Sequence, residues 1–347
     1  MINKRIEIVS SNIRELSSMS SKSRLAIADS LRGHYAHVGI TLINKPSDLI
    51  GLLAKRPDVV LLGMMYVPLV PVSEGDSETR VWLNEFLSRH GIATTGSVWQ
   101  SHLMEKDKQL AKLQAQSQGL KTAPFFVTNK TSVHLINKEI LDFPLFVKPT
   151  NKGGGLGVDN FSVVHNYEEM ISKVGSISDK FNTDSLIEVY LPGREFSVAI
   201  IKSLTTNQFK AMPLELIAPV NNNGDKILSS QVKSSDTEKF VAVNDDGLKT
   251  QLQNLALNVF KALNGRDYGR IDIRLDKFGV ANFLEANLIP SLLKDYGNFP
   301  KACKLNAGID YETMLLTIVQ LALKRTSATE AGLNIQPIYP HKIVSTI

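Results

Sequence analysis

Short runs of alternating apolar and polar residues dominate the C-terminal third of the chain. In RIDIRL (270–275) every second residue is apolar, which predicts a half-buried strand with one polar face. NFLEAN (282–287) follows after a tight turn and predicts the returning strand of a hairpin. Glu285 and Asn287 are two positions apart and therefore share a face of that strand. We expect Asp272 to lie on the same side.

The N-terminal third has the pattern of an α/β unit. Strands are predicted at IEIVS (6–10), VGITLI (38–43) and DVVLLG (58–63). A helix is expected from about Ser21 to Arg32, and a second one over 77–90, ended by Gly91. This first unit would span residues 1–96.

The remaining pattern predicts two further units, 97–187 and 188–347. Ser97 is expected to cap a long helix that continues through Gln118, where Gly119 ends it. Strands are predicted around FFVTN (125–129), FPLFVKP (143–149), EFSVAII (195–201) and FKAMPLEL (209–216), and helices at about 245–263 and from Tyr311 to Lys324.

A glycine-rich segment follows the strand that ends near Lys148, with glycines at positions 153, 154, 155 and 157. Such a loop can lie over a phosphate chain with its N–H groups turned inward, and a lysine at a strand end supplies a fixed positive charge. It is not a P-loop, because no Gly-Lys-Ser/Thr opens a helix. The segment predicts a phosphate site, and a glycine-rich hairpin without a ligand is the alternative.

Asp272, Glu285 and Asn287 would bring three oxygen donors together. Mg²⁺ prefers hard oxygen ligands and usually takes only one or two carboxylates from the protein, leaving other positions to water and phosphates. The pattern therefore predicts a magnesium site for a nucleotide. The alternative is an acidic hairpin on a solvated face.

Taken together, these motifs resemble the ATP-grasp superfamily and, within it, the D-alanine–D-alanine ligases. The resemblance is carried by Lys148 before the glycine loop, EVYL at 188–191, GREFSV at 193–198, RIDIR at 270–274 and LEAN at 284–287. It extends over nearly the whole chain. The helix before the glycine loop resembles the one that carries the family's other nucleotide lysine, here Lys108. The first loop resembles the one with a substrate-binding acid and serine, here Glu15 and Ser17.

The resemblance implies an α/β protein with α+β lobes and the ATP-grasp fold. A Rossmann-like preATP-grasp domain would occupy 1–96, a small central lobe with the glycine loop 97–187, and a lobe with the metal and catalytic residues 188–347. It also implies two steps: ATP phosphorylates a carboxylate, and an amine then attacks the acyl phosphate.

The site residues follow from the same resemblance. Lys108, Lys148 and the backbone of Gly154 and Gly155 would hold the phosphates, while Asp272, Glu285 and Asn287 would bind two Mg²⁺ ions, for which Mn²⁺ can substitute. Val189, Tyr190 and Leu191 would frame the adenine, with Glu188 on its amino edge and Glu195 on the ribose. Arg270 would touch the transferred group, because its planar fork suits oxyanions. Glu15, Ser17, Lys233 and Ser291 complete the expected substrate side.

Three edges of the substrate pocket depart from the family pattern. The family's His-Gly-x-x-Gly-Glu-Asp-Gly is replaced by GMMYVPLVPVSEGDSE (63–78), without the histidine. The covering loop, VNNNGDKILSSQVKSSD (220–236), keeps Lys233 but lacks the family's tyrosines. Ser291 stands where the family has a glycine whose N–H lies near the oxyanion.

We weigh three functions. The first, which these departures favour, is a ligase of specialised metabolism that joins an amino acid to a second carboxylate or carbonyl substrate. Ligases of mycosporine-like amino acid formation, which use mycosporine-glycine, resemble the chain in length and plan. The second is a D-alanine–D-alanine ligase of cell-wall synthesis. The third is a non-catalytic nucleotide-binding protein, against which stands the full set of nucleotide and metal residues.

Composition agrees with a globular enzyme: 43% of the 347 residues are hydrophobic and 21% are charged. No apolar run approaches the ~20 residues of a membrane span, and the N-terminus has no signal core, so we expect a cytoplasmic protein without a membrane partner. The net charge of +5 comes from scattered Lys and Arg residues, which argues against a nucleic-acid partner. Cys303 is the only cysteine and is expected to pack rather than react. A homodimer is compatible with the resemblance, because relatives are often dimers.

Overall fold

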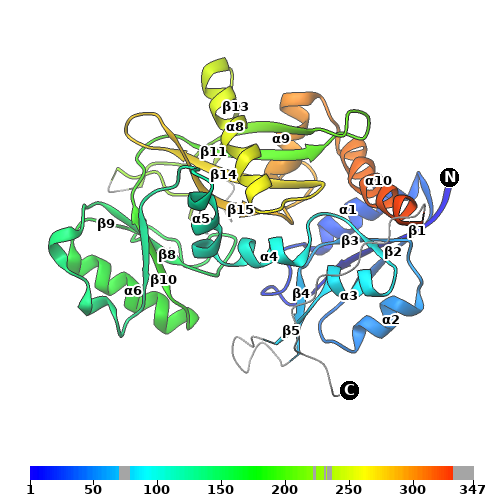
Figure 1. Cartoon of the computed structure of the whole chain (residues 1–347), viewed down its shortest axis with the longest axis horizontal. Coiled ribbons are helices and arrows are strands. Elements are labelled where there is room, and N and C mark those ends of the chain that lie inside the picture. The colour runs from blue at the N-terminus through cyan, green and yellow to red at the C-terminus, as the bar shows by residue number, and fades with distance from the viewer. Residues whose placement is uncertain (70–78, 222–223, 230–231, 233–236, 331–347) are drawn as a thin grey trace.

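The computed structural model describes residues 1–69, 79–221, 224–229, 232 and 237–330. Within these ranges the chain is a mixed α/β protein, as expected, and three sheets with their helices lie side by side (Figure 1). A fourth, two-stranded sheet is attached to the N-terminal unit.

The N-terminal unit is a parallel sheet covered by helices on both faces. Its order is β2 (Tyr35–Leu42), β1 (Ile2–Ser10), β3 (Val59–Leu62) and β6 (Ala93–Thr94), with α1 (Ser21–Arg32), α2 (Asp48–Ala54) and α3 (Leu83–Arg89) around it. Ile6 and Ile8 of β1 belong to one buried cluster and Val9 to another. Successive side chains of β1 therefore fill the cores on opposite faces of the sheet. The three predicted strands and the predicted helix α1 are confirmed.

Of the helix predicted over 77–90, residues 77 and 78 lie outside the described residues, and the prediction is wrong over Arg80–Trp82. Arg80–Trp82 form strand β5, which pairs antiparallel with β4 (Tyr66–Pro68), and α3 begins only at Leu83. The rings of Tyr66 and Trp82 meet edge to face at a centroid distance of 5.3 Å. This cross-strand contact overrides the helical periodicity of the segment.

The long helix predicted from Ser97 to Gln118 is two helices, α4 (Trp99–Lys106) and α5 (Lys108–Ser117). Asp107 lies between them in an extended conformation, and its side chain caps α5 by accepting hydrogen bonds from the N–H groups of Gln109 and Leu110. Ser97 does not cap a helix: its hydroxyl accepts a hydrogen bond from the N–H of Arg266. The break puts Lys108 at the first position of α5.

The second sheet is small, and its three strand pairings are all antiparallel. Its order is β7 (Phe125–Thr128), β10 (Ser185–Val189), β8 (Leu145–Pro149) and β9 (Val163–Val164). Helix α6 (Tyr167–Phe181) packs on it through Met170, Val174 and Ile177. Two 3₁₀ turns, Val133–Leu135 and Lys138–Ile140, join β7 to β8.

The third sheet carries the expected metal hairpin. Its order is β13 (Lys239–Ala242), β12 (Phe209–Ile217), β11 (Glu195–Lys202), β14 (Tyr268–Leu275) and β15 (Ala281–Asn287). Helix α8 (Asp246–Ala262) covers one face and α9 (Asn298–Ala307) the other. Along β11, Val198 and Ile200 lie in the core under α8, whereas Ala199 and Ile201 lie in the core under α9.

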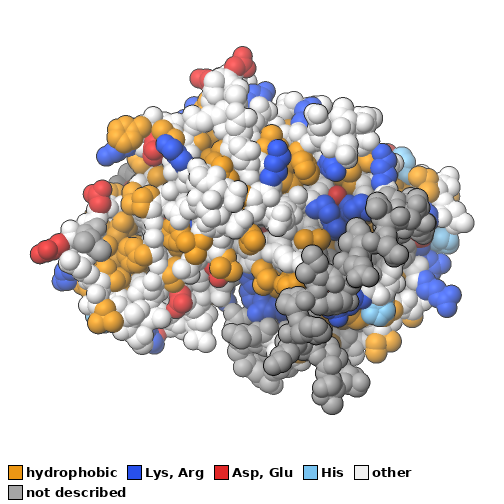
Figure 2. All heavy atoms as spheres, viewed as in Figure 1, with side chains coloured by type: hydrophobic (Ala, Val, Ile, Leu, Met, Phe, Trp, Pro, Cys, Tyr) orange, Lys and Arg blue, Asp and Glu red, His pale blue; other side chains and the backbone are white. Residues whose placement is uncertain are grey.

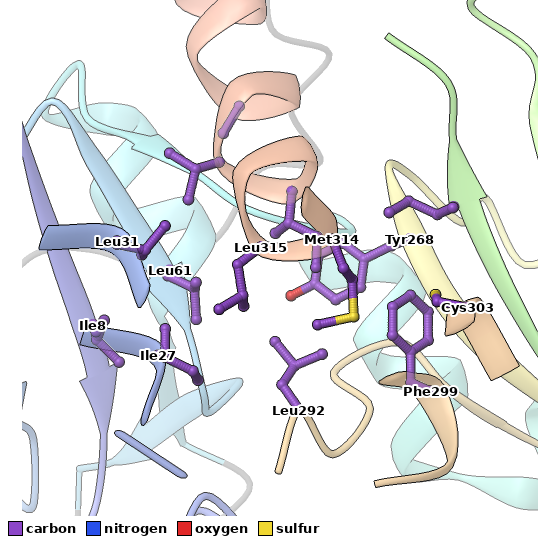
Figure 3. Close-up of a cluster of buried hydrophobic side chains, with 14 of the residues drawn as sticks. Ile8, Ile27, Leu31, Leu61, Tyr268, Leu292, Phe299, Cys303, Met314 and Leu315 are labelled. Atoms are coloured by element: carbon purple, nitrogen blue, oxygen red, sulfur yellow. The ribbon is translucent and has the colours of Figure 1, made fainter. Parts of the chain in front are cut away.

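The last helix joins the N-terminal unit to the third sheet. Helix α10 runs from Tyr311 to Glu330, six residues beyond the predicted end at Lys324. Figure 3 shows Leu315 of α10 between Leu31 and Leu61 on one side and Tyr268 and Phe299 on the other. Cys303 lies in the same fully buried cluster, and burial raises the pKa of its thiol to about 12. The cysteine is therefore a packing residue.

Helices α4 and α5 both contact β15 of the third sheet, and the apolar face of α5 packs there. Ala111 and Ala115 of α5 belong to the same buried cluster as Phe283 of β15. The domain division at 96/97 and 187/188 stays a prediction, and this packing associates residues 99–117 with the C-terminal unit.

Lys and Arg side chains are spread over several parts of the face drawn in Figure 2. In the described ranges no helix combines the length and the apolar character that a membrane crossing requires.

Candidate active site

Strands β14 and β15 bring the three predicted metal residues together. In the antiparallel pair, Asp272 lies opposite Glu285 and Arg270 lies opposite Asn287, with a bulge after Asp272. Alternate residues of a strand share a face, so these four side chains occupy one polar surface of the sheet. The local alternation that predicted the hairpin also sets this register.

Asp272 is the centre of a hydrogen-bond network and is only 9% exposed. Its carboxylate accepts hydrogen bonds from Nε and Nη2 of Arg270 at 2.9 and 2.8 Å. It also accepts bonds from Ser197 Oγ at 2.7 Å and Asn287 Nδ2 at 3.1 Å. Burial lowers the pKa of the Arg270 guanidinium, but the facing Asp272 outweighs it and the pKa is raised. Arg270 therefore stays charged.

The donor set fits a magnesium ion that also binds phosphate. Asp272, Glu285 and Asn287 offer two carboxylates and an amide oxygen, the hard donors that Mg²⁺ prefers. Among the described residues no cluster of three or more His, Cys, Asp or Glu side chains could hold a metal by itself. Phosphates and water would have to complete the coordination, as is usual for magnesium at nucleotide sites.

Glu188 lies between two lysines. Its Oε1 is 2.6 Å from Lys148 Nζ, and its Oε2 is 2.8 Å from Lys112 Nζ. Lys112 is completely buried, and Glu188 is 4% exposed. The ammonium of Lys112 also donates to Thr122 Oγ1 and to the carbonyl of Phe283 in β15. The family resemblance predicts that Glu188 lies on the amino edge of adenine. In the structure its carboxylate is the counterion of Lys112 and Lys148.

Burial raises the pKa of Glu188, but Lys112 and Lys148 lower it by more than burial raises it, so the pKa is about 2. Burial lowers the pKa of the Lys148 ammonium, but Glu188 and Glu285 outweigh it, so the pKa is raised. Both groups are therefore charged near neutral pH. The ammonium group of Lys148 is therefore a fixed positive charge at the end of β8, just before the glycine loop.

The low pKa of Glu188 predicts a loss of stability in acid. The carboxylate is paired with two lysines in the folded state and has a pKa of about 2 there, against an ordinary value of 4.5. Its contribution is complete above pH 4.5 and is lost as the pH falls toward 2, with a magnitude on the order of 3 kcal/mol. Urea unfolding between pH 6 and 3 should show this slope. A Glu188→Gln variant should lack it, and an unchanged slope in that variant would contradict the assignment.

The cap at Asp107 positions Lys108, the second lysine predicted to bind the nucleotide. The backbone N–H of Lys108 donates to the carbonyl of Thr150, which ties α5 to the glycine-loop segment. Lys108 Nζ donates to the carbonyl of Lys152 at 2.5 Å and lies 3.8 Å from Glu285 Oε2. Lys108 therefore lies between the glycine loop and the metal hairpin.

Strand β10 runs into residues 188–191, which we call the hinge because they lead from the small sheet toward β11 of the third sheet. The expected adenine frame lies in this hinge. The N–H groups of Val189 and Tyr190 donate to the carbonyls of Pro124 and Pro144, so these two donors are already used. Leu191 is almost fully buried. The adenine frame stays a prediction, and this geometry limits it to the remaining backbone groups of 189–191.

Two adjoining cavities gather nearly all the predicted site residues. The first, of about 300 Å³, is lined by Lys108, Lys148, Gly154, Gly155, Glu188, Val189, Tyr190, Leu191, Glu195, Arg270, Asp272, Glu285, Asn287 and Ser291. The second, of about 1050 Å³, is lined by Glu15 and Ser17 and shares Lys108, Glu285 and Asn287 with the first. Ser17 Oγ donates to the carbonyl of Gly63. Lys233 lies outside the described residues.

The glycine loop offers a sharp test at Gly157. A Cβ there would lie 2.4 Å from Pro149 Cγ, and the φ angle is +79°. Gly157→Ala should displace the loop and raise KM for ATP by about tenfold or more, because both the clash and the left-handed backbone oppose a side chain. Gly153→Ala is the matched control, since its Cβ would meet nothing within 4 Å. Equal KM values for the two variants, measured by ADP release, would show that the loop does not need this conformation.

Four residues of the site were not predicted from the sequence. Lys112 could have been noticed, because it follows Lys108 by one helical turn. Ser197 and Arg274 lie in motifs already identified but carry no spacing signal of their own. Glu105 accepts hydrogen bonds from the N–H groups of Leu288 and Ile289, directly after Asn287. No local pattern indicates that contact.

Comparisons with known proteins place the chain in a family. The family model for the D-ala D-ala ligase C-terminus matches residues 114–320. The chain is 27% identical over 315 residues to a D-alanine–D-alanine ligase of Clostridium beijerinckii, covering 90% of this chain and 96% of the relative. It is 29% identical over 245 residues to one of Buchnera aphidicola, covering 67% and 73% of the two chains.

Solved structures show the same fold. The D-alanine–D-alanine ligase from Bacillus anthracis matches with a TM-score of 0.70 at 21% identity, covering 94% of this chain and 99% of that chain. Its complex with ATP matches with a TM-score of 0.69. The fold is therefore the ATP-grasp fold. Because the family model covers more than half of the chain, the protein belongs to the D-alanine–D-alanine ligase family of ATP-grasp enzymes, the ADP-forming C–N ligases.

Proposed function

We propose that the protein joins two amino acids by an amide bond at the expense of ATP, and that D-alanine supplies both. The observation that carries the reaction type is the convergence of Lys108, Lys148, Arg270 and the hairpin carboxylates on one cavity. The relatives named above are D-alanine–D-alanine ligases, and this supports D-alanine as the first substrate to test.

In the first step a carboxylate oxygen of the first amino acid attacks the γ-phosphorus of ATP, and ADP leaves. Negative charge spreads over the transferred oxygens, so catalysis depends on fixed cations around them. Lys108 and Lys148 hold the phosphate chain, and the Arg270 fork faces the transferred group. Asp272, Glu285 and Asn287 would hold Mg²⁺, which when bound neutralises charge on the phosphates.

In the second step the amine of the other amino acid attacks the acyl carbon, and phosphate leaves as the amine loses a proton. The exposed carboxylate of Glu15 lines the larger cavity and can pair with an ammonium group of the substrate. The backbone N–H of Ser291 is a donor for the oxyanion at the edge of the smaller cavity. Closing the cavity against water protects the acyl phosphate from hydrolysis.

The test is ADP release by the purified protein with ATP, Mg²⁺ and D-alanine alone, with L-alanine as the matched control and product masses recorded. ADP and a D-alanine dipeptide support the proposal. ADP without a dipeptide, or no turnover on D-alanine, refutes D-alanine as the substrate pair.

A second candidate is a ligase of specialised metabolism that joins an amino acid to a different partner, such as mycosporine-glycine. It is favoured by the segment Met64–Tyr66, which replaces the family's histidine motif and lines the larger cavity. The Tyr66 ring also makes cation–π contacts with two side chains: Arg80 Cζ lies 4.7 Å and Lys106 Nζ 5.1 Å from its centroid. Turnover that requires an L-amino acid together with mycosporine-glycine, and a product of the combined mass less water, would establish this reading.

A further inference from the structure

Arg274 is a buried arginine that the proposed reaction does not use. It stands on β14 directly opposite Glu195 on β11, and its side chain is 8% exposed. Its guanidinium donates to Glu195 Oε2 at 3.1 Å, to Tyr190 Oη at 3.1 Å and to the carbonyl of Lys226 at 2.9 Å. Its Nε donates to the carbonyl of Gly193 at 3.2 Å.

These acceptors belong to three different parts of the nucleotide cavity. Tyr190 lies in the hinge, Glu195 is the expected ribose carboxylate, and Lys226 begins the part of the covering loop whose Ile227 and Leu228 line the cavity. The guanidinium also lies over the Tyr190 ring, 5.1 Å from its centroid. A planar fork with five donors can hold all of these groups at once, which a lysine cannot do.

We propose that Arg274 is a positioning residue that orients Glu195 toward the ribose hydroxyls of ATP and fixes segment 224–229 over the nucleotide. The proposal rests on the proposed function, because it takes ATP as the ligand of this cavity. One oxygen of Glu195, Oε2, is used by Arg274. The pairing fixes the plane of the carboxylate, so that its orientation toward a sugar hydroxyl is set before ATP binds.

The first experiment measures the preference for ATP over 2′-deoxy-ATP and 3′-deoxy-ATP as the ratio of kcat/KM values. The variants are Arg274→Met, Arg274→Lys and Glu195→Gln. The matched control is Arg194→Met, which removes an arginine that forms a two-bond pair with Glu215 on the neighbouring strand β12, outside both cavities.

The wild type should prefer ATP to at least one analogue by about tenfold, the value of one charge-assisted hydrogen bond. Arg274→Met and Arg274→Lys should reduce this preference to about twofold, mainly through KM, and Arg194→Met should keep it. A preference that is unchanged in both Arg274 variants overturns the proposal. Arg274→Lys also carries the test if Arg274→Met does not fold. If the wild type does not bind ATP, the proposed function fails instead.

A second readout needs no nucleotide. Trypsin cleaves after lysine, and Lys226 is exposed although its carbonyl is held by Arg274. Cleavage after Lys226, followed by mass spectrometry, should be at least about fivefold faster in Arg274→Met than in the wild type or Arg194→Met, because local opening controls proteolysis. Equal cleavage rates in all three proteins would show that Arg274 does not fix this segment, whatever the ligand.

Discussion

Asp272→Asn is expected to lower kcat at least about 10²- to 10³-fold, the size of effect seen when one group that stabilises transition-state charge is removed. The change removes the charge of a proposed metal ligand and one strong acceptor of the Arg270 fork. Arg270 and the metal would then both be misplaced for the transferred phosphoryl group. The measurement is ADP release at saturating ATP, with circular dichroism to verify the fold.

Glu285→Gln gives an independent test of the same site. Glu285 is 26% exposed, so its replacement disturbs the core less than a change at Asp272. Asp276→Asn is the control. Asp276 lies just past the end of β14, and its Oδ1 accepts hydrogen bonds from the N–H groups of Phe278 and Val280, which an asparagine can also do. Turnover that persists in Asp272→Asn or Glu285→Gln would disprove the metal assignment. A comparable loss in Asp276→Asn would show that the effect is not specific to the site.

The metal hairpin could be predicted because its information is local. Alternation in RIDIRL and NFLEAN sets which side chains face one way, and a short turn sets which residues lie opposite each other. The same holds for the N-terminal strands and for α1, which has a serine cap at its first turn. The helix break at Asp107 was missed, because Asp107 interrupts an otherwise helical pattern with a capping side chain.

The contacts that support the site could not be predicted, because they join distant segments. Glu105 and Leu288 are 183 positions apart and meet only because α4 packs beside the end of β15. Lys112 forms an ion pair with Glu188 because α5 packs on β15 and this packing brings the Lys112 side chain to the end of β10. The sequence identifies Arg274 only as one of the polar residues of its strand and gives no sign of the groups that it contacts. Local patterns thus predict the residues that line the candidate site, and tertiary packing decides which other residues hold them in place.

Glu188→Gln is expected to destabilise the protein by about 3 to 5 kcal/mol, because it leaves the buried ammonium groups of Lys112 and Lys148 without their counterion. Lys112 has no exposed surface, so water cannot replace the lost charge. Burial already lowers the pKa of Lys112, and the loss of Glu188 removes the group that opposes this shift. Urea unfolding at pH 7 measures the change in the free energy of unfolding.

Further variants test whether the stability lost in Glu188→Gln comes from the broken ion pairs or only from poorer packing. They are Lys112→Met alone, its combination with Glu188→Gln, and Asp179→Asn. Lys112→Met combined with Glu188→Gln should recover more than half of the stability that Glu188→Gln loses. The double variant leaves only Lys148 without its carboxylate, whereas Glu188→Gln alone leaves both Lys112 and Lys148 without it. Asp179→Asn, which breaks the exposed pair of Lys130 and Asp179 with side chains 57% and 64% exposed, should change stability by less than about 1 kcal/mol. If the double variant were instead as unstable as the sum of the two single changes, Lys112 and Glu188 would not be coupled, and the low pKa of Glu188 would need another cause. Coupling of the expected sign would mean that the hinge, α5 and β15 are held together by one buried charge cluster, and this cluster includes Lys148, the lysine that we propose binds the phosphates.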